Sequence, residues 1–264
     1  MISFGFIGCG NMGGTLALAV AKSTENVAVS DRSADAVNNI TAACGAKASS
    51  NTEIAEQAQF VVLGVKPQVL PAVLAEIAPV LKARTDRFVL ISMAAGVKIE
   101  TVAATVGAQV PIIRIMPNTP AAIGKGTILY TCNAAVTDEE KKAFETAFTP
   151  AGEIIEIAEG LIDAASAVSG CGPAFAYLFI EALADGGVRC GLPRDLAQKL
   201  AAQTVSGSAD MVLLSGKHPG ALKDAVCSPA GSTIEGVEVL EKGAFRGVTA
   251  EAVTAAYRRT KELG

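Results

Sequence analysis

The chain lacks tryptophan, and His218 is the only histidine among its 264 residues. Its six cysteines include no Cys-x-x-Cys pair. Imidazole clusters and paired thiolates, the usual ligands of zinc and iron, are therefore missing, and we expect no metal site. We expect the cysteines to be reduced and mostly buried. The N-terminal apolar run has no basic residues before it, which predicts a first strand rather than a signal peptide, and a cytoplasmic protein.

An excess of positive charge is also missing. Lys and Arg number 22 against 26 Asp and Glu, a net charge of −4, so we expect neither nucleic acid nor an anionic membrane as a partner. Hydrophobic residues reach 50% but come in short runs such as 16–21 and 60–65. A membrane span needs about 20 in succession, so we expect none. With only 18% charged residues, we expect some apolar surface to be buried between subunits.

The first part of the chain alternates short apolar strands with helical stretches, which predicts a parallel, doubly wound sheet of the α/β class. The expected strands are 2–7, 27–30, 60–65, 88–92 and 112–115, and the expected helices are 16–22, 34–43, 71–81 and 99–106.

After about Leu161 the strand-like runs stop, and Ala, Leu, Glu and Lys recur with helical spacing. Helices are predicted over 173–188, 193–214, 232–241 and 249–263; the first two begin at a proline, a residue favoured at that position. The pattern predicts an α/β domain over residues 1–158 and an all-helical domain over residues 159–264.

A glycine fingerprint, G-x-G-x-x-G, occupies residues 8–13, between the first expected strand and a helix. In such a turn the first glycine allows the tight bend, the second lets a pyrophosphate approach the backbone, and the third packs helix against strand. The N–H groups at the helix N-terminus then bind the phosphates. The alternative is a merely structural turn, but the position after a strand favours a dinucleotide cofactor.

The end of the second strand carries conflicting signals for the choice of cofactor. Asp31 stands where an acidic residue binds the ribose hydroxyls of NAD. Arg32 and Ser33 follow it and could hold the 2′-phosphate of NADP. Asp31 or Ser33 could equally cap the next helix. We favour NADP, with NADPH as the preferred donor and NADH as the alternative.

Six further segments follow expected strands or lie in the helical part. They are 64–67 (Gly-Val-Lys-Pro), 93–96 (Met-Ala-Ala-Gly), 116–120 (Met-Pro-Asn-Thr-Pro), 168–175, 218–224 and 226–235. In this order and spacing the chain resembles the pyrroline-5-carboxylate reductase family over essentially its whole length. The most specific element is Ser-Pro-x-Gly-x-Thr at 228–233.

The resemblance implies an NAD(P)H-dependent oxidoreductase acting on a C=N bond. Members reduce the cyclic imine of 1-pyrroline-5-carboxylate by hydride transfer to L-proline, the last step of proline biosynthesis. The implied fold is an N-terminal Rossmann-type doubly wound parallel sheet with a C-terminal all-helical dimerisation domain. We therefore expect a homodimer or higher homo-oligomer formed through the C-terminal helices, with the active site bordered by two subunits.

The resemblance also implies which residues bind each ligand. The expected cofactor-binding residues, with Ser33 added for its place beside Arg32, are Ile7, Gly8, Cys9, Gly10, Asn11, Met12, Arg32, Ser33, Asn51, Val65, Lys66, Pro67, Ala94, Ala95 and Gly96. The expected substrate-binding residues, with Asn118 added for its place after a strand, are Asn118, Ser228, Ser232 and Thr233, and the expected catalytic residue is Thr233, near the imine nitrogen.

The chain departs from the family pattern at three positions. Cys171 and Phe175 stand where members commonly have Ser and Tyr, so no hydroxyl role is carried over to these positions. Ala230 stands where Gly is commoner.

The chemistry is compatible with a chain that has one histidine. A cyclic imine is basic enough to be partly protonated in water, so the hydroxyl of Thr233 need only orient the nitrogen. Residues 228–233 lead into a helix and so offer N–H groups to the substrate carboxylate. The plainer readings are a helix cap for Thr233, a solvated surface lysine for Lys66 and a turn residue for Asn118. For His218 we expect a structural role at a helix start.

Two other functions are weighed against reduction of an imine. A β-hydroxyacid dehydrogenase has a similar plan, but such enzymes use a lysine on the helix that begins the second domain, and 172–187 contains none. The other alternative is a non-catalytic NADP-binding sensor or a pyridoxal-type regulatory protein, and the intact segment at 228–233 argues against both because a sensor has no need of an imine site.

Overall fold

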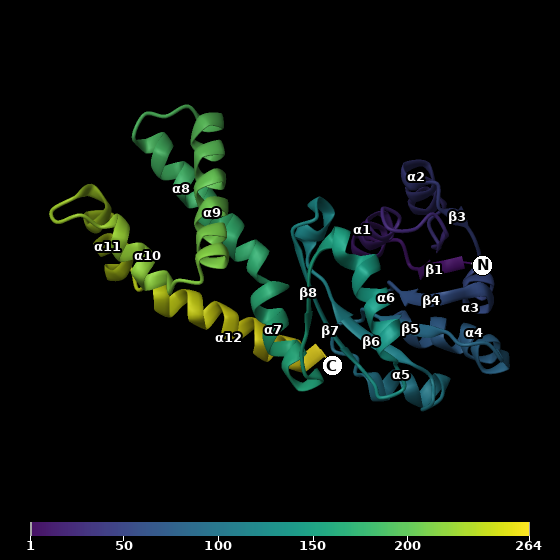
Figure 1. The fold of residues 1–264 in the computed structure, drawn as a ribbon. Helices are drawn as coiled ribbons and strands as arrows, with labels where there is room; N and C mark the ends of the chain where they lie inside the picture. Colours follow the sequence, from purple (N-terminus) through teal and green to yellow (C-terminus); the bar gives the residue numbers. More distant parts are fainter. Residues whose placement is uncertain (1, 264) are drawn as a thin grey trace. The chain divides into compact units, whose positions relative to one another are not determined.

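The computed structural model describes residues 2–263 of the chain. It divides into two compact units. The first contains the residues up to Gly170 together with those from Tyr257 onward, and the second contains Cys171–Ala256. The first unit is a layered α/β structure and the second is made of helices, as Figure 1 shows for each.

The first unit is built on an eight-stranded sheet with the order β3-β2-β1-β4-β5-β6-β7-β8. The strands are β1 Ile2–Ile7, β2 Val27–Ser30, β3 Lys47–Ala48, β4 Ala58–Leu63, β5 Val89–Ser92, β6 Ile112–Met116, β7 Gly126–Cys132 and β8 Gly152–Glu156. Neighbours from β3 to β6 are parallel. Their order is that of a doubly wound dinucleotide-binding sheet, which confirms the predicted Rossmann-type fold.

The sheet is mostly rather than wholly parallel. β7 runs antiparallel to β6, and β8 is parallel to β7. A short connection, residues 117–125, joins β6 to β7 and contains a 3-10 turn, Thr119–Ile123. A parallel pair needs a crossover of a dozen or more residues, so this short connection forces the reversal.

Seven helices of the first unit flank the sheet or follow it. They are α1 Asn11–Val20, α2 Ala34–Cys44, α3 Asn51–Gln57, α4 Leu70–Ala83, α5 Ile99–Val106, α6 Asp138–Phe148 and α7 Ile162–Ser169. Alternate residues of β4 enter two hydrophobic cores, Phe60 and Val62 in one and Val61 and Leu63 in the other. This period of two is what a strand buried on both faces requires.

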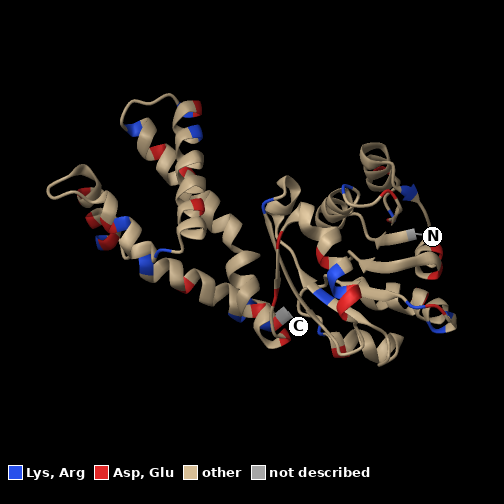
Figure 2. Cartoon of the chain, in the orientation of Figure 1, with Lys and Arg blue, Asp and Glu red and all other residues tan. Residues whose placement is uncertain are grey.

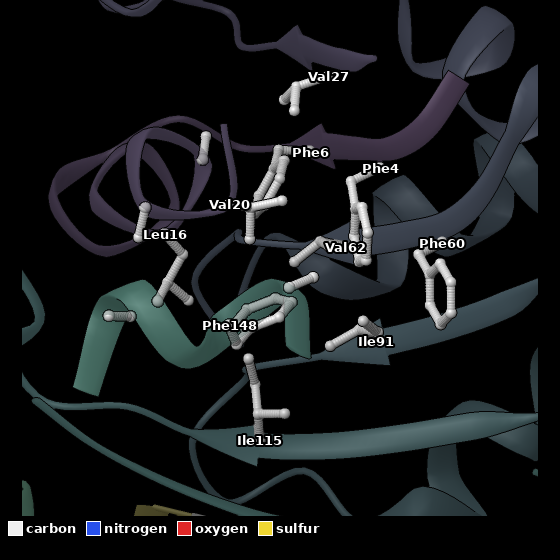
Figure 3. Packing of buried hydrophobic residues seen from close by; sticks show 14 of the residues in the cluster. Phe4, Phe6, Leu16, Val20, Val27, Phe60, Val62, Ile91, Ile115 and Phe148 are labelled. Atoms are coloured by element: carbon white, nitrogen blue, oxygen red, sulfur yellow. The ribbon is translucent and has the colours of Figure 1, made fainter. Parts of the chain in front are cut away.

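The core on the α1 side holds six of the twelve aromatic side chains of the sequence. Phe4 stacks on Phe60 with ring centroids 4.6 Å apart and meets Phe148 of α6 edge-on. Leu16 and Val20 of α1 pack into the same cluster, as Figure 3 shows. Burying a side chain of this size stabilises the fold by about 1.5–3 kcal/mol. The core therefore fixes α1, and with it the glycine turn that precedes the helix.

The expected elements agree with the structure to within a few residues, with two shifts that matter. The strand expected at 60–65 lies at Ala58–Leu63, so Val65 belongs to the following loop. The helix expected from 16 begins at Asn11. The strands and α-helices for which no range was predicted are β3, β7, β8, α3, α6, α7 and α10.

The second unit consists of helices. They are α8 Gly172–Arg189, α9 Arg194–Ser215, α10 Pro219–Val226, α11 Ser232–Lys242 and the first part of α12, which spans Phe245–Leu263. Its buried cluster contains three alanines, Ala184, Ala197 and Ala201. Leu213 and Leu214, by contrast, are 79% and 87% exposed. Within one chain this unit leaves most of its large apolar side chains uncovered.

Within residues 2–263, one helical stretch, 159–189, is long and apolar enough by length and composition to cross a membrane, although the core helix of a soluble protein passes the same test. No charged side chain occurs between Asp163 and Glu181, and Figure 2 shows this part of α7 and α8 without blue or red. The expected absence of a membrane partner remains a prediction.

Candidate active site

The turn from β1 into α1 is tight at its ends and open in its middle. A Cβ on Gly13 would lie 2.0 Å from the carbonyl oxygen of Gly8, and Gly8 itself has a φ of 99°. Both positions therefore require glycine. A Cβ on Gly10 would meet nothing within 4 Å. The second glycine thus borders open space, where a phosphate can approach the backbone.

The N-terminus of α1 faces the same space. Gly10 is the N-cap residue and supplies no side-chain hydrogen bond. The first-turn N–H groups therefore lack a side-chain cap, and the helix dipole adds partial positive charge. A phosphate group accepts hydrogen bonds from these N–H groups, and the partial positive charge attracts it.

Two cavities meet at this turn. The first has a volume of about 430 Å³ and is lined in part by Ile7, Gly8, Gly10, Asp31, Arg32 and Asn51. The second has a volume of about 590 Å³ and is lined in part by Asn11, Met12, Pro67, Met93, Ala95 and Met116. Gly10, Gly64, Val65 and Lys66 line both. Two adjoining cavities with the glycine turn between them suit the two halves of a dinucleotide.

At the end of β2 the acidic residue is engaged by the main chain. The N–H groups of Cys9 and Ser33 donate to the two carboxylate oxygens of Asp31, at 2.6 and 2.9 Å. Ser33 caps α2 by accepting from the N–H of Ala36. Arg32 is exposed and lines the first cavity, and no carboxylate pairs with it among residues 2–263. This arrangement leaves a cation available for a 2′-phosphate.

Asn51 belongs to a short polar chain at the edge of the first cavity. Its Oδ1 accepts from the hydroxyl of Ser30 at 2.8 Å, and its Nδ2 donates to Glu76 at 2.9 Å. Sequence reasoning placed Asn51 here through the resemblance and missed Glu76, which comes from α4. The only signal was its helical spacing from Val69 and Val73, which line the same cavity.

The second cavity is bordered by residues at the carboxyl ends of three neighbouring strands. Lys66 and Pro67 follow β4, Met93 and Ala95 follow β5, and Met116 ends β6. Ligands of open α/β sheets bind at this edge. Met93 and Met116 were not assigned to the site from sequence, although their places directly after strands were a usable signal.

Four of the expected cofactor residues line neither cavity. They are Cys9, Ser33, Ala94 and Gly96. Ala94 is buried, and Gly96 has a φ of 76° in the same loop. Burial, with Asp31 nearby, raises the pKa of Cys9 to about 11, so this thiol is protonated at neutral pH.

Asn118 is buried, and both ends of its amide are engaged. Its Nδ2 donates to the carbonyl oxygen of Ser169, and its Oδ1 accepts from the N–H of Thr127, each at 2.8 Å. These two bonds link the loop after β6 to the start of β7 and the end of α7. The predicted contact with substrate stays a prediction.

The segment from Ser228 to Thr233 forms a turn that opens α11. Gly231 is the N-cap residue, with no side-chain cap, and its N–H donates to the carbonyl oxygen of Ser228 at 3.0 Å. Thr233 is exposed and does not cap the helix. The interpretation of Thr233 as an ordinary helix cap is therefore wrong. The turn presents hydroxyl groups and an uncapped helix N-terminus together.

Ala230 has a φ of 56°, in the left-handed region. A side chain is disfavoured there and glycine is favoured. This explains in physical terms why a glycine suits the position at which the chain departs from the family pattern.

His218 caps α10, and its Nδ1 accepts from the N–H of Gly220 at 3.0 Å. This confirms its expected role at a helix start. Cys171 precedes α8 and Cys227 follows α10, and both thiols are free. No cluster of three or more His, Cys, Asp or Glu side chains suited to a metal occurs in the described part of the chain, residues 2–263.

Comparison with known proteins gives matches over both units. A family model described as NADP oxidoreductase coenzyme F420-dependent matches residues 3–96. A second model, described as pyrroline-5-carboxylate reductase dimerisation, matches residues 159–263.

Among curated proteins, the chain is 43% identical to pyrroline-5-carboxylate reductase of Pisum sativum, over 99% of this chain and 96% of the relative. A crystal structure of Plasmodium falciparum pyrroline carboxylate reductase with NADP bound shares 38% identity with a TM-score of 0.88, over 100% of this chain and 98% of that one. The structure of a pyrroline-5-carboxylate reductase from Coxiella burnetii shares 32% identity with a TM-score of 0.90, over 100% and 99%.

Proposed function

The chain belongs to the pyrroline-5-carboxylate reductase family, and on this premise we propose that it reduces the cyclic imine of 1-pyrroline-5-carboxylate to L-proline with NADPH. It is an NADP-dependent oxidoreductase that acts on a C=N bond. The observation that carries the proposal is the pair of adjoining cavities over the uncapped N-terminus of α1, with Arg32 at one end.

The residues of the two cavities fit NADP(H), which supplies the hydride when bound. The backbone from Gly8 to Met12 holds the pyrophosphate at the helix N-terminus. Arg32 holds the 2′-phosphate, because its guanidinium is exposed at the first cavity and pairs with no carboxylate among residues 2–263. Lys66, Pro67 and Ala95 border the space for the nicotinamide half.

The remaining predicted cofactor residues have indirect parts in this proposal. Cys9 and Ser33 hold Asp31 through their N–H groups. Asn51 shapes the rim of the first cavity, and Ala94 and Gly96 shape the loop that follows β5.

The turn at 228–233 holds the substrate in this proposal. The uncapped N-terminus of α11 and the hydroxyls of Ser228 and Ser232 bind the carboxylate. The hydroxyl of Thr233 holds the imine nitrogen in place, and the proton on that nitrogen comes from water, because a cyclic imine is basic enough to be protonated there. Asn118 positions the loop after β6 through its two bonds.

We also propose that the chain assembles as a homodimer or larger homo-oligomer through its C-terminal helices. The support is the match of residues 159–263 to a dimerisation model together with the exposed leucines of α9. In this proposal a second copy of the chain, and not a lipid bilayer, covers the apolar stretch 159–189. We propose accordingly that the protein works in the cytoplasm. The functional boundary between the domains lies at 158/159, where that family match begins.

Replacement of Thr233 tests the substrate half of the proposal. Thr233→Val keeps the shape and removes the hydroxyl, so kcat/KM for pyrroline-5-carboxylate should fall about 10- to 100-fold, the value of one hydrogen bond to a charged group. Thr233→Ser should retain most of the activity. NADPH affinity, measured by fluorescence titration, should not change in either variant.

The matched control is Thr146→Val on α6, where the hydroxyl of an exposed threonine donates to the carbonyl oxygen of Lys142 in the same helix. It should leave kcat/KM unchanged. Full activity of Thr233→Val would remove Thr233 from the mechanism.

A further inference from the structure

A carboxylate outside the recognised motifs faces the first cavity. Glu76 lies on α4, and Val69, Ala72, Val73 and Glu76 line the cavity together. Their spacing of i, i+3, i+4 and i+7 puts them on one face of the helix. The first three are apolar and suit contact with the flat adenine ring of a nucleotide. Glu76 adds a negative charge at the end of that face.

Asn51 fixes the position of Glu76. The amide Nδ2 of Asn51 donates to Oε2 of Glu76 at 2.9 Å, and the amide oxygen accepts from Ser30 Oγ at 2.8 Å. Ser30 is the last residue of β2. The chain of bonds therefore ties the carboxylate of Glu76 to the strand end where cofactors of this fold place their adenosine ribose.

Asp31 occupies the position that usually binds the ribose hydroxyls, but here its oxygens accept from the N–H groups of Cys9 and Ser33. Within residues 2–263, Glu76 Oε2 accepts from Asn51 and Oε1 accepts no hydrogen bond. Of the two carboxylates that line the cavity, Glu76 is therefore the one with an oxygen that is wholly free for a ligand, whereas each oxygen of Asp31 already accepts one N–H group.

We propose that Glu76 determines the choice between the two nicotinamide cofactors, in opposition to Arg32. Its carboxylate accepts a hydrogen bond from the adenosine ribose of NAD(H) and repels the 2′-phosphate of NADP(H). Arg32, which lines the same cavity, attracts that phosphate. This inference rests on the proposed function, since it takes the first cavity to hold the adenosine half of the cofactor.

The charge-neutral variant Glu76→Gln keeps the size of the side chain and its bond to Asn51. Removing one like charge beside a partly solvated phosphate should tighten binding of the phosphorylated nucleotide about tenfold. The unphosphorylated nucleotide should bind several-fold more weakly, because a hydrogen bond to a charged acceptor becomes one to a neutral acceptor.

The test uses isothermal titration calorimetry of the full-length protein with adenosine 2′,5′-bisphosphate and, separately, with 5′-AMP. Neither probe can be reduced, so the readout does not depend on turnover. For Glu76→Gln the ratio of the two affinities should shift at least tenfold toward the bisphosphate. The control Glu25→Gln makes the same charge change at an exposed residue outside the cavity and should leave the ratio unchanged. Thermal melting checks that each variant is folded.

The outcomes separate the two proposals. If the wild-type protein binds neither probe, the assignment of the cavity to NADP(H), and with it the proposed function, fails. If the wild type binds both probes but the ratio of their affinities in Glu76→Gln stays within twofold of the wild-type ratio, the inference about Glu76 fails while the proposed function stands. An equal loss of both affinities also overturns the inference, because such a result would mean that Glu76 only positions Asn51 and does not discriminate between the cofactors.

Discussion

Gly10 and Gly13 stand three residues apart in one turn, and we expect their replacement by alanine to have different effects on stability and on cofactor binding. At Gly10 the new Cβ meets nothing within 4 Å, and the backbone, with φ −63° and ψ −170°, is open to any residue. At Gly13 the new Cβ would lie 2.0 Å from the carbonyl oxygen of Gly8. Non-bonded carbon and oxygen atoms cannot approach so closely, so the turn or α1 must shift.

The magnitudes follow from these contacts. Gly10→Ala should change the stability of the fold by less than about 1 kcal/mol, because alanine restricts the unfolded chain but is a poorer N-cap residue than glycine. For a chain of this size that is a change in Tm of no more than about 4 °C. The same Cβ occupies the space where the pyrophosphate approaches, so NADPH should bind at least tenfold more weakly. Gly13→Ala should destabilise by about 3 kcal/mol or more, since the clash is with backbone and not with a movable side chain.

Differential scanning fluorimetry and NADPH fluorescence titration, applied to both variants, measure the two effects separately. A Gly10→Ala protein that binds NADPH as tightly as the wild type would refute the assignment of this space to the pyrophosphate. A Gly10→Ala protein that melts well below the wild type would refute the reading of the turn as open at Gly10.

Two further predictions concern strain and pH. Ala230→Gly should raise stability by about 1 kcal/mol, because the residue has a φ of 56°, a conformation that glycine adopts without steric cost; an unchanged or lower Tm would contradict this. Burial and the hydrogen bond to Glu145 raise the pKa of Tyr130 above its ordinary value. Tyr130 therefore binds its proton more tightly in the folded state, and its stabilising contribution is complete below pH ~10 and lost as the pH rises further. Urea unfolding at pH 8 and pH 11 should show a smaller loss of stability for Tyr130→Phe than for the wild type, and equal losses would exclude Tyr130 as a cause.

The elements predicted most accurately from sequence were those with one uniform pattern. The strand Val27–Ser30 and the helix Ile99–Val106 match the expected bounds because a short, largely apolar run and amphipathic spacing are local signals. Helix α6 was missed because it is highly charged and depends on the capping box of Thr137 and Glu140. Strand β3 has only two residues, Lys47–Ala48, and owes its existence to pairing with β2.

The candidate site, too, could be predicted only where its residues belong to local sequence patterns. Gly8, Gly10 and Lys66 could be placed from sequence because their motifs follow strands directly. Glu76 could not, since only the packing of α4 beside α3 brings it to Asn51. The engagement of Asp31 by the N–H groups of Cys9 and Ser33 is likewise tertiary information, and it bears on the conflict between the NAD and NADP signals that the sequence left open.

The most direct test of the proposed activity is the oxidation of NADPH, followed by absorbance, when purified protein is mixed with 1-pyrroline-5-carboxylate. We expect rapid loss of absorbance with L-proline as the product, and a higher kcat/KM with NADPH than with NADH. Folded protein that binds NADPH but oxidises neither cofactor in the presence of this imine would contradict the proposed activity.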